Sequence, residues 1–502
     1  MATTENFLQE INNGYNFKGD HVNIGCGMLD GKVVPGAFIS IPLKTMNRHG
    51  LIAGATGTGK TKTLQVIAEV LSDASVPVLL MDIKGDLSGI GAEGAANDKI
   101  TARSNLINIP FHPAAFPVEF LTLSDEKGIR LRATVSEFGP ILLSKILGLN
   151  DTQGGLVSMI FKYCDDHKMP LLNLPDFIKV LQYVSNEGKS ELQKEYGQVS
   201  SASTGTILRK VVELQQQGAD IFFGEPSFDI DDLMRISDDG RGMVNILRVT
   251  DMQTRPKLFS TFMLQMLAEL YASLPEVGDQ DRPKLVLFID EAHLLFDEAT
   301  SVLLQQIESI IKLIRSKGVG VFFCTQNPQD IPASVLAQLG MKVQHALRAF
   351  TAADRDAIKK AAQNFPVTSF YKIEDLLTQM GIGEAMITFL NEKGIPTPLV
   401  HTMLRAPNSR MDILSNDEIN AIVAQSKLAS KYNREVDSIS AYEILNDKIA
   451  NAAQSKNEET ETKKTKKEKS FFDSSAVKQV ERTAASVITR NLLGILGKMF
   501  KK

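Results

Sequence analysis

The chain has 502 residues, 43% of them apolar, which is enough for two or three domains around a large core. A net charge of −4 and a pI near 6.1 exclude a wholly basic nucleic-acid coat protein, but not binding through a local basic surface or the lumen of a ring. Its three scattered cysteines form no zinc or disulfide pattern, and there is neither a signal-peptide pattern nor a run of about 18 apolar residues. We therefore expect a cytoplasmic protein without a membrane span.

The first 47 residues predict short extended segments joined by glycine turns, a short N-terminal β segment that is too small for a core of its own. From Arg48 onward, apolar strands alternate with helices, a pattern typical of an α/β domain with a mainly parallel sheet. The predicted strands are Gly50–Gly54, Val76–Ile83, Val244–Val249, Leu285–Asp290, Val319–Thr325 and Ala385–Leu390. The predicted helices between them include Thr61–Ala74, Lys257–Ser273 and Ser301–Ser316. We assign residues 48–408 to this domain.

Residues from about 125 to 240 have apolar side chains at helical spacing, which predicts a helical insertion within the domain. Its expected helices are Asp125–Leu147, Gly155–His167, Leu174–Val184 and Thr204–Gln217.

The C-terminal part divides into three predicted segments. Residues 409–453 predict peripheral helices, and residues 454–470 are charged and aperiodic, which predicts a flexible linker. Residues 471–502 predict an amphipathic helical tail. This tail would pack on its own assembly, dock a protein partner or lie on a membrane surface.

One glycine-rich segment matches the pattern GxxxxGK[ST] at every position. It consists of Gly54, Ala55, Thr56, Gly57, Thr58, Gly59, Lys60 and Thr61. Such glycines let backbone N–H groups turn inward around a β-phosphate, and the dipole of the following helix adds to the attraction. Lys60 would neutralise β- and γ-phosphate oxygens, and Thr61 would bind Mg²⁺. The preceding strand and the following helix favour this P-loop over an ordinary glycine-rich turn.

A second segment places two carboxylates after an apolar strand. Asp290 would hold the water shell of Mg²⁺, and Glu291 would activate the attacking water as a general base. For His293, which follows closely, we favour a structural role over catalysis. Gln326, at the end of another apolar strand, would contact the γ-phosphate or the water; capping of backbone groups is the alternative. Together these segments predict a RecA-like P-loop ATPase domain that uses ATP and Mg²⁺.

The segments GATGTGKT and LFIDEAH, with an arginine eleven residues before Gln326, resemble the HerA–FtsK superfamily of ring-forming motor ATPases. The segment NRHGLIAGATGTGKT, followed by MDIKGDLSGI, is similar to a bacterial HerA-like branch, and the resemblance covers about residues 45–400. It implies that Arg315 acts across a subunit interface as an arginine finger. It also implies that an acidic residue after the second strand assists hydrolysis; Asp82 and Asp86 both qualify, and capping of the turn is the alternative. HerA proteins usually carry an N-terminal β-barrel, and the 47 residues before Arg48 are too few for one.

The leading functional hypothesis is an ATP-driven ring, most simply a hexamer, that translocates or unwinds double-stranded DNA. One alternative is an ATPase of the same fold that remodels or transports protein, as in secretion and conjugation. Another is a nucleotide-dependent interaction switch, and a protein partner would bind through the C-terminal tail. ATP is preferred to GTP because the chain has no NKxD motif for reading guanine.

Overall fold

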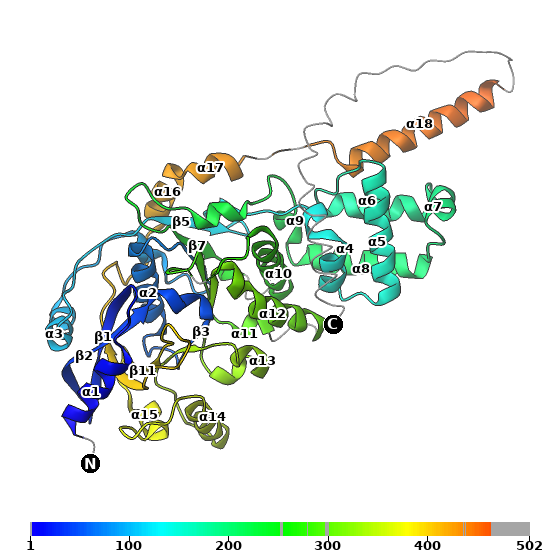
Figure 1. Ribbon diagram of the computed structural model, residues 1–502. Helices are drawn as coiled ribbons and strands as arrows, with labels where there is room; N and C mark the ends of the chain where they lie inside the picture. Colours follow the sequence, from blue (N-terminus) through cyan, green and yellow to red (C-terminus); the bar gives the residue numbers. More distant parts are fainter. Residues whose placement is uncertain are drawn as a thin grey trace. The chain divides into compact units, whose positions relative to one another are not determined.

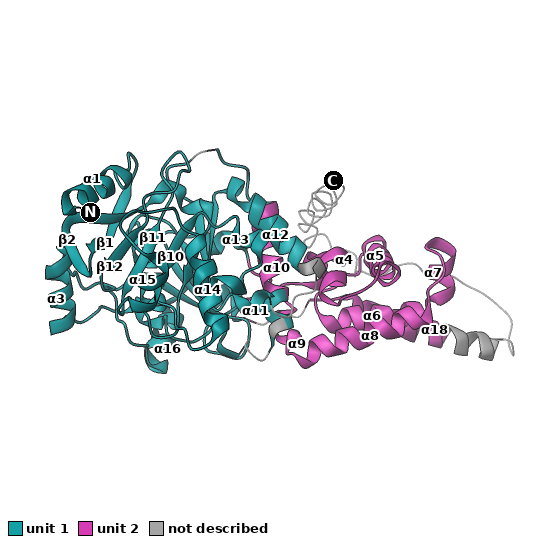
Figure 2. Cartoon of the chain, turned by 90° about the horizontal axis from the view of Figure 1, so that it is seen from below, with its two compact units in different colours: residues 1–130, 229–260, 273–433 teal, residues 131–228, 261–272, 434–502 magenta. Residues whose placement is uncertain are grey.

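Buried parallel strands form the centre of this fold, as the continuous apolar segments predict. The computed structural model describes residues 3–251, 255–278, 280–296, 301–434, 436 and 438–462. These residues form two compact units, drawn in teal and magenta in Figure 2. Unit 1 contains residues 1–130, 229–260 and 273–433, and unit 2 contains residues 131–228, 261–272 and the described part of 434–502.

Twelve strands of the described residues form one sheet, which lies entirely in unit 1. They are β1 (His21–Leu29), β2 (Lys32–Pro42), β3 (Gly50–Ala53), β4 (Val78–Asp82), β5 (Val118–Thr122), β6 (Ile129–Arg130), β7 (Val244–Arg248), β8 (Leu285–Ile289), β9 (Val319–Thr325), β10 (Met341–Gln344), β11 (Glu384–Thr388) and β12 (Val400–Leu404). Their order is β2-β1-β12-β11-β10-β3-β9-β8-β4-β7-β5-β6. Neighbours run parallel from β10 to β6 and antiparallel from β2 to β10. The predicted α/β class with a mainly parallel sheet is confirmed.

The six predicted strands correspond to β3, β4, β7, β8, β9 and β11, with ends that differ by one or two residues. Four further strands, β5, β6, β10 and β12, were not predicted from the sequence. Buried polar side chains interrupt the apolar pattern in three of them, at Glu119, Gln344 and Thr402. The fourth, β6, has only two residues, too few to show a period.

The helices of unit 1 lie before and after these strands. They are α1 (Thr4–Gly14), α2 (Lys60–Asp73), α3 (Asp98–Ile107), α11 (His293–Phe296), α12 (Ser301–Ile314), α13 (Ala333–Leu336), α14 (Ala352–Gln363), α15 (Ile373–Gln379), α16 (Asn416–Gln425) and α17 (Lys427–Tyr432), while α10 (Pro256–Ser273) contributes residues to both units. Helix α2 is buried along most of its length, from Thr63 to Ser72, which makes it a central helix of the core.

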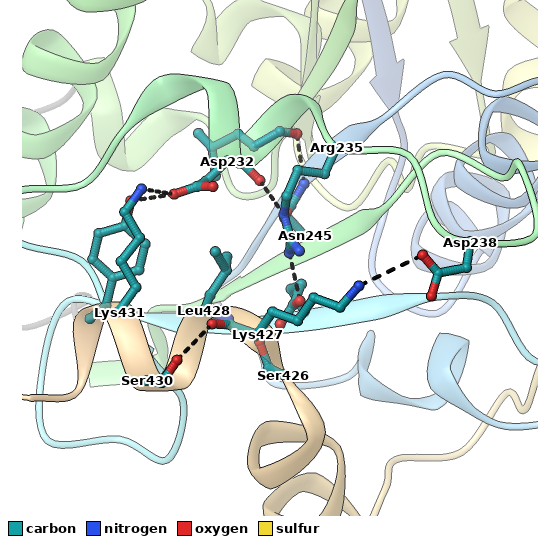
Figure 3. A network of polar contacts seen from close by, with 12 residues as sticks. Asp232, Arg235, Asp238, Asn245, Ser426, Lys427, Leu428, Ser430 and Lys431 are labelled. Carbon is teal, nitrogen blue, oxygen red and sulfur yellow. Dashed lines mark hydrogen bonds and ion pairs between the residues drawn. The ribbon is translucent and has the colours of Figure 1, made fainter.

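The short helix α17 forms ion pairs with two aspartates. Lys431 Nζ lies 2.7 Å from Asp232, and Lys427 pairs with Asp238 (Figure 3).

The N-terminal segment differs from its prediction in two ways. It begins with α1, whose Thr3 side chain caps the first turn and whose Phe7 and Ile11 are buried one turn apart. In addition, β1 pairs with β12, so residues 21–42 extend the main sheet (Figure 1) and there is no domain boundary at residue 47. The boundary was misplaced because its partner strand, Val400–Leu404, comes almost 380 residues later.

Helices α4 to α9 lie within the predicted range of 125–240, but their compact unit also contains residues 261–272 and helix α18, outside that range. Unit 2 contains α4 (Val135–Ile146), α5 (Asp151–Asp166), α6 (Leu174–Ser185), α7 (Lys189–Glu195), α8 (Ser201–Gln216), α9 (Ala219–Phe222) and α18 (Ala441–Thr462). The start of α18 is anchored to α6, because the buried carboxylate of Asp176 accepts hydrogen bonds from Ser440 Oγ and from the N–H of Tyr442. Farther along α18, Lys448 Nζ lies 2.9 Å from Glu191.

The prediction of a flexible linker at 454–470 is wrong for its first part, because residues 454–462 belong to helix α18. Once the anchored first turns exist, adding further residues requires no new nucleation, so even a polar segment extends the helix. The rest of the predicted linker and the tail at 471–502 lie outside the described residues. No helix of the described residues is both long and apolar enough to cross a bilayer.

Candidate functional site

The predicted site residues meet at one edge of the sheet because their strands are neighbours. The order β3-β9-β8-β4 places the P-loop, Gln326, Asp290 and Asp82 at the carboxyl ends of four adjacent parallel strands. In sheets of this kind, ligands bind at that edge. Gly54 N–H donates to the carbonyl of Thr325 over 3.2 Å, which ties the P-loop directly to the end of β9.

The glycines of the loop are required by its shape. Gly54, Gly57 and Gly59 have φ angles of 151°, 77° and 113°, in the region that other residues rarely adopt. A Cβ atom on Gly54 would also lie 2.5 Å from the Cβ of His345. The backbone therefore has the curvature that a phosphate cradle requires.

His345 packs against the loop, a role that the sequence analysis did not predict. Its Nδ1 lies 2.9 Å from the carbonyl of Glu384 and its Nε2 lies 2.9 Å from Thr63 Oγ1. Because a carbonyl only accepts, Nδ1 carries the proton and Nε2 accepts from the Thr63 hydroxyl. Burial lowers the pKa of His345 to about 4, so it is neutral at pH 7.

Lys60 begins α2 and is buried, with its ammonium group inside the loop. Its Nζ donates to the carbonyl oxygens of Gly54 and Ala55 over 2.6 and 3.2 Å. Burial lowers the pKa of Lys60, and the positive charge of Lys84 lowers it further. An anion in the loop would relieve both effects. Thr61, the next residue, is partly exposed at the same helix N-terminus.

Asp290 and Glu291 follow β8 and are both 5% exposed. Glu291 has a φ of 43°, a left-handed conformation that costs on the order of 1 kcal/mol. The turn is fixed because the next residue, Ala292, donates its N–H to the carbonyl of Cys324 on β9 over 2.9 Å.

The carboxylate of Asp290 fits a cation. Its Oδ2 is buried and accepts no hydrogen bond from any described residue. Burial raises the pKa of Asp290 to about 6, although the charge of Lys84 opposes the rise. A divalent cation nearby would stabilise the charged form. The described residues contain no cluster of three or more His, Cys, Asp or Glu side chains that could hold a metal. The unpartnered oxygen of Asp290 suits Mg²⁺, which is usually bound by one or two protein ligands together with substrate phosphates and water.

The carboxylate of Glu291 contacts two side chains. Lys84, from the turn after β4, forms an ion pair with its Oε1, and His293 Nδ1 lies 3.3 Å from its Oε2. His293 therefore contacts the predicted base. Lys84 was not singled out in the sequence, where its only sign was its place in MDIKGD beside the two candidate aspartates.

The structure separates the two aspartates of this turn. Asp82 is buried, and its carboxylate accepts hydrogen bonds from the N–H groups of Gly85, Asp86 and Leu87. Burial raises the pKa of Asp82 to about 7 against these hydrogen bonds. Asp86 is partly exposed, and its Oδ1 accepts no hydrogen bond from the described residues. Asp82 thus caps the turn, and Asp86 is the aspartate left available to a ligand.

Gln326 and Arg315 lie at opposite ends of β9. Gln326 is exposed just after the strand, at the edge that carries the P-loop. Arg315 is exposed at the end of α12, before the strand begins, and its guanidinium makes no ion pair or hydrogen bond with the described residues. The seven residues of β9 span roughly 20 Å, which is longer than an arginine side chain. The fold therefore does not bring Arg315 to the P-loop of its own chain.

Comparisons with known proteins agree with this geometry. A family model described as "Helicase HerA-like C-terminal" matches residues 30–492. The DNA double-strand break repair helicase HerA of Sulfolobus acidocaldarius is 21% identical over 359 residues, which cover 70% of this chain and 64% of that protein. The DNA import protein CedB of the same organism is 26% identical over 293 residues, covering 57% of this chain and 42% of that protein.

Among solved structures, the bacterial conjugative coupling protein TrwBdeltaN70, in its unbound monoclinic form, is similar with a TM-score of 0.50 at 15% identity. The similarity covers 79% of this chain and 97% of that one. At this level of identity the likeness concerns the fold, and it supports the predicted RecA-like α/β architecture.

Proposed function

We propose, from the premise that this chain belongs to the family of HerA-like helicase C-terminal domains, that it hydrolyses ATP and uses the energy to move double-stranded DNA. The match to the curated HerA relative spans 64% of that protein's length, so activity, substrate and partners are inferred from the chain's own residues. The observation that carries the proposal is the meeting of the P-loop, Asp290 and Glu291 at one edge of the sheet.

Each residue of the site has a role in this proposal. The P-loop backbone and Lys60 bind the phosphates, and Thr61 and Asp290 hold Mg²⁺. When bound, Mg²⁺ supplies positive charge that neutralises the phosphate oxygens. Glu291 accepts the proton of the attacking water, and Gln326 orients that water or the γ-phosphate.

Arg315 makes the site depend on assembly. Because it lies at the opposite end of β9 from the P-loop of its own chain, it serves a neighbouring subunit. A cation supplied in this way stabilises charge on the transferred phosphoryl group and accelerates hydrolysis about 10³-fold or more. The contact is head-to-tail, and such contacts close into a ring when the rotation allows it. We propose a hexamer.

DNA is proposed as the transported polymer because both curated relatives named above carry DNA in their names. The test is the ATPase rate with and without linear double-stranded DNA, together with the mass of the assembly. We expect a ring-sized mass and a rate that DNA increases several-fold. A monomer whose ATPase rate is the same with and without DNA would contradict the motor proposal. An ATPase rate that an unfolded protein increases, and DNA does not, would favour the protein-transport alternative.

A further inference from the structure

A lysine that the proposed mechanism does not use is in contact with its general base. Lys84 follows β4 and Glu291 follows β8, and these strands are direct neighbours in the sheet. The Lys84 ammonium is paired with Oε1 of Glu291, whose side chain is 6% exposed, whereas that of Lys84 is 32% exposed. The lysine therefore reaches from a partly open turn into the buried turn that holds the base.

Lys84 is also close to the phosphate site. Its charge is the main electrostatic cause, after burial, of the lowered pKa of Lys60. Partial burial opposes the charged form of Lys84, but the ion pair with Glu291 and the neighbouring carboxylates outweigh burial and raise its pKa. The site thus holds two lysine side chains, one inside the P-loop and one on the base.

We propose that Lys84 is a positioning residue with two alternative partners, Glu291 and the γ-phosphate of ATP. This inference rests on the proposed ATPase function. A γ-phosphate carries more negative charge than a carboxylate, so it competes for the ammonium group. When Lys84 turns to the phosphate, Glu291 loses its ion pair and its Oε1 becomes available to the attacking water. ADP lacks the γ-phosphate and leaves the ion pair intact. Release of the base is therefore linked to the presence of ATP.

The first test compares the binding of ADP and of a non-hydrolysable ATP analogue with a β,γ-imido bridge. Lys84→Met should weaken analogue binding about tenfold, the size of one charge-assisted hydrogen bond, and change ADP binding less than twofold. Lys84→Arg, which keeps the charge, should restore most of the loss. Lys44→Met is the matched control, because Lys44 is also 32% exposed and pairs with a carboxylate, Asp281, away from the phosphate site. Equal weakening of both nucleotides by Lys84→Met would show a merely structural lysine and overturn the proposal.

The second test is a double-mutant cycle on the same two ligands. Glu291→Gln removes the charge that competes for Lys84, so it should tighten analogue binding several-fold and leave ADP binding unchanged. In the Lys84→Met background that gain should disappear, because no ammonium group remains to be released. Additive effects of the two substitutions would overturn the exchange of partners.

These outcomes separate the inference from the proposed function. If the full chain binds neither nucleotide, the ATPase proposal itself fails. If it binds both and Lys60→Ala abolishes binding, but Lys84→Met binds the analogue as tightly as the parent chain, only the exchange of partners fails.

Discussion

At the scale of single residues, substitutions of the base Glu291 and of the phosphate-binding Lys60 are expected to have different effects. Glu291→Gln keeps the shape of the side chain and loses its basicity, so it should bind ATP yet hydrolyse it about 100-fold more slowly or worse. Lys60→Ala should lose both affinity and turnover. Nucleotide titrations and phosphate release measured on the same preparations distinguish the two. Normal turnover by Glu291→Gln would assign the base to another carboxylate, and Asp86, whose Oδ1 accepts no hydrogen bond from the described residues, is a candidate.

The same scale shows which site residues a sequence reveals. Lys60, Asp290 and Glu291 belong to contiguous motifs, so their chemistry and spacing could be predicted before their geometry was known. Lys84 and His345 could not, because each matters only through a partner far along the chain, Glu291 and Thr63 respectively. Asp82 and Asp86 could be told apart only by the backbone N–H groups that surround one of them.

At the scale of secondary-structure elements, His49 holds α12, the helix that leads to Arg315, against the sheet. Its Nδ1 accepts from the N–H of Val321 over 3.0 Å and its Nε2 donates to the carbonyl of Ile311 over 2.8 Å. Burial lowers the pKa of His49 from 6.5 to about 4, so the neutral ring stabilises the fold above pH 6.5. Between pH 6.5 and 4 the unfolded chain binds a proton that the folded chain does not, and stability is lost as the pH falls.

We therefore predict that the free energy of unfolding falls by about 2 kcal/mol between pH 7 and pH 5 because of His49 alone. Chemical denaturation at both values, on the parent chain and on His49→Gln, measures it. The variant should be less stable at pH 7 but lose about 2 kcal/mol less than the parent on acidification. If the parent chain and His49→Gln lose the same free energy of unfolding between pH 7 and pH 5, then His49 binds a proton as readily in the folded chain as in the unfolded chain.

A buried ion pair gives a second prediction at this scale. Glu119 on β5 is 4% exposed, and its Oε1 accepts a hydrogen bond from Arg235 over 2.6 Å. Arg235 also donates to the backbone carbonyl of Asp232, the residue that pairs with Lys431 of α17 (Figure 3). Arg235→Met leaves this carboxylate without its cation and should cost about 3 kcal/mol. The double variant Glu119→Leu/Arg235→Met should recover most of that loss, as denaturation midpoints would show. A double variant no more stable than Arg235→Met would contradict a charge-based cost.

Prediction of the elements succeeded where burial was continuous and failed where it was not. The strands β8 and β9 are buried at every position, so their apolar segments marked them clearly. The edge formed by β1, β2 and β12 was missed as part of the sheet because its pairing joins the two ends of the domain. Helix α18 was cut short in the prediction because its anchor, Asp176, belongs to another helix.

At the scale of the whole molecule, the family match over residues 30–492 confirms the HerA-like resemblance of the motifs. The proposed ring makes a prediction about mixed assemblies. Arg315→Ala and Glu291→Gln subunits should each be inactive alone, yet mixtures should regain part of the activity, because some interfaces pair an intact arginine with an intact base. Phosphate release measured across mixing ratios should peak between the two pure samples. No activity at any ratio, with co-assembly demonstrated, would count against an arginine that acts on its neighbour.

The central claim is that the P-loop, Asp290 and Glu291 form an ATPase site that a neighbouring subunit completes. It is tested most directly by phosphate release per subunit at saturating ATP and Mg²⁺, measured as the concentration of the full chain is raised. We predict that the rate per subunit rises with concentration and levels off as the assembly forms, while Lys60→Ala stays at background throughout. A rate no greater than that of Lys60→Ala would contradict the assignment of these residues to an ATPase site. A rate per subunit that stays constant while the assembly forms would contradict the claim that a neighbouring subunit completes the site.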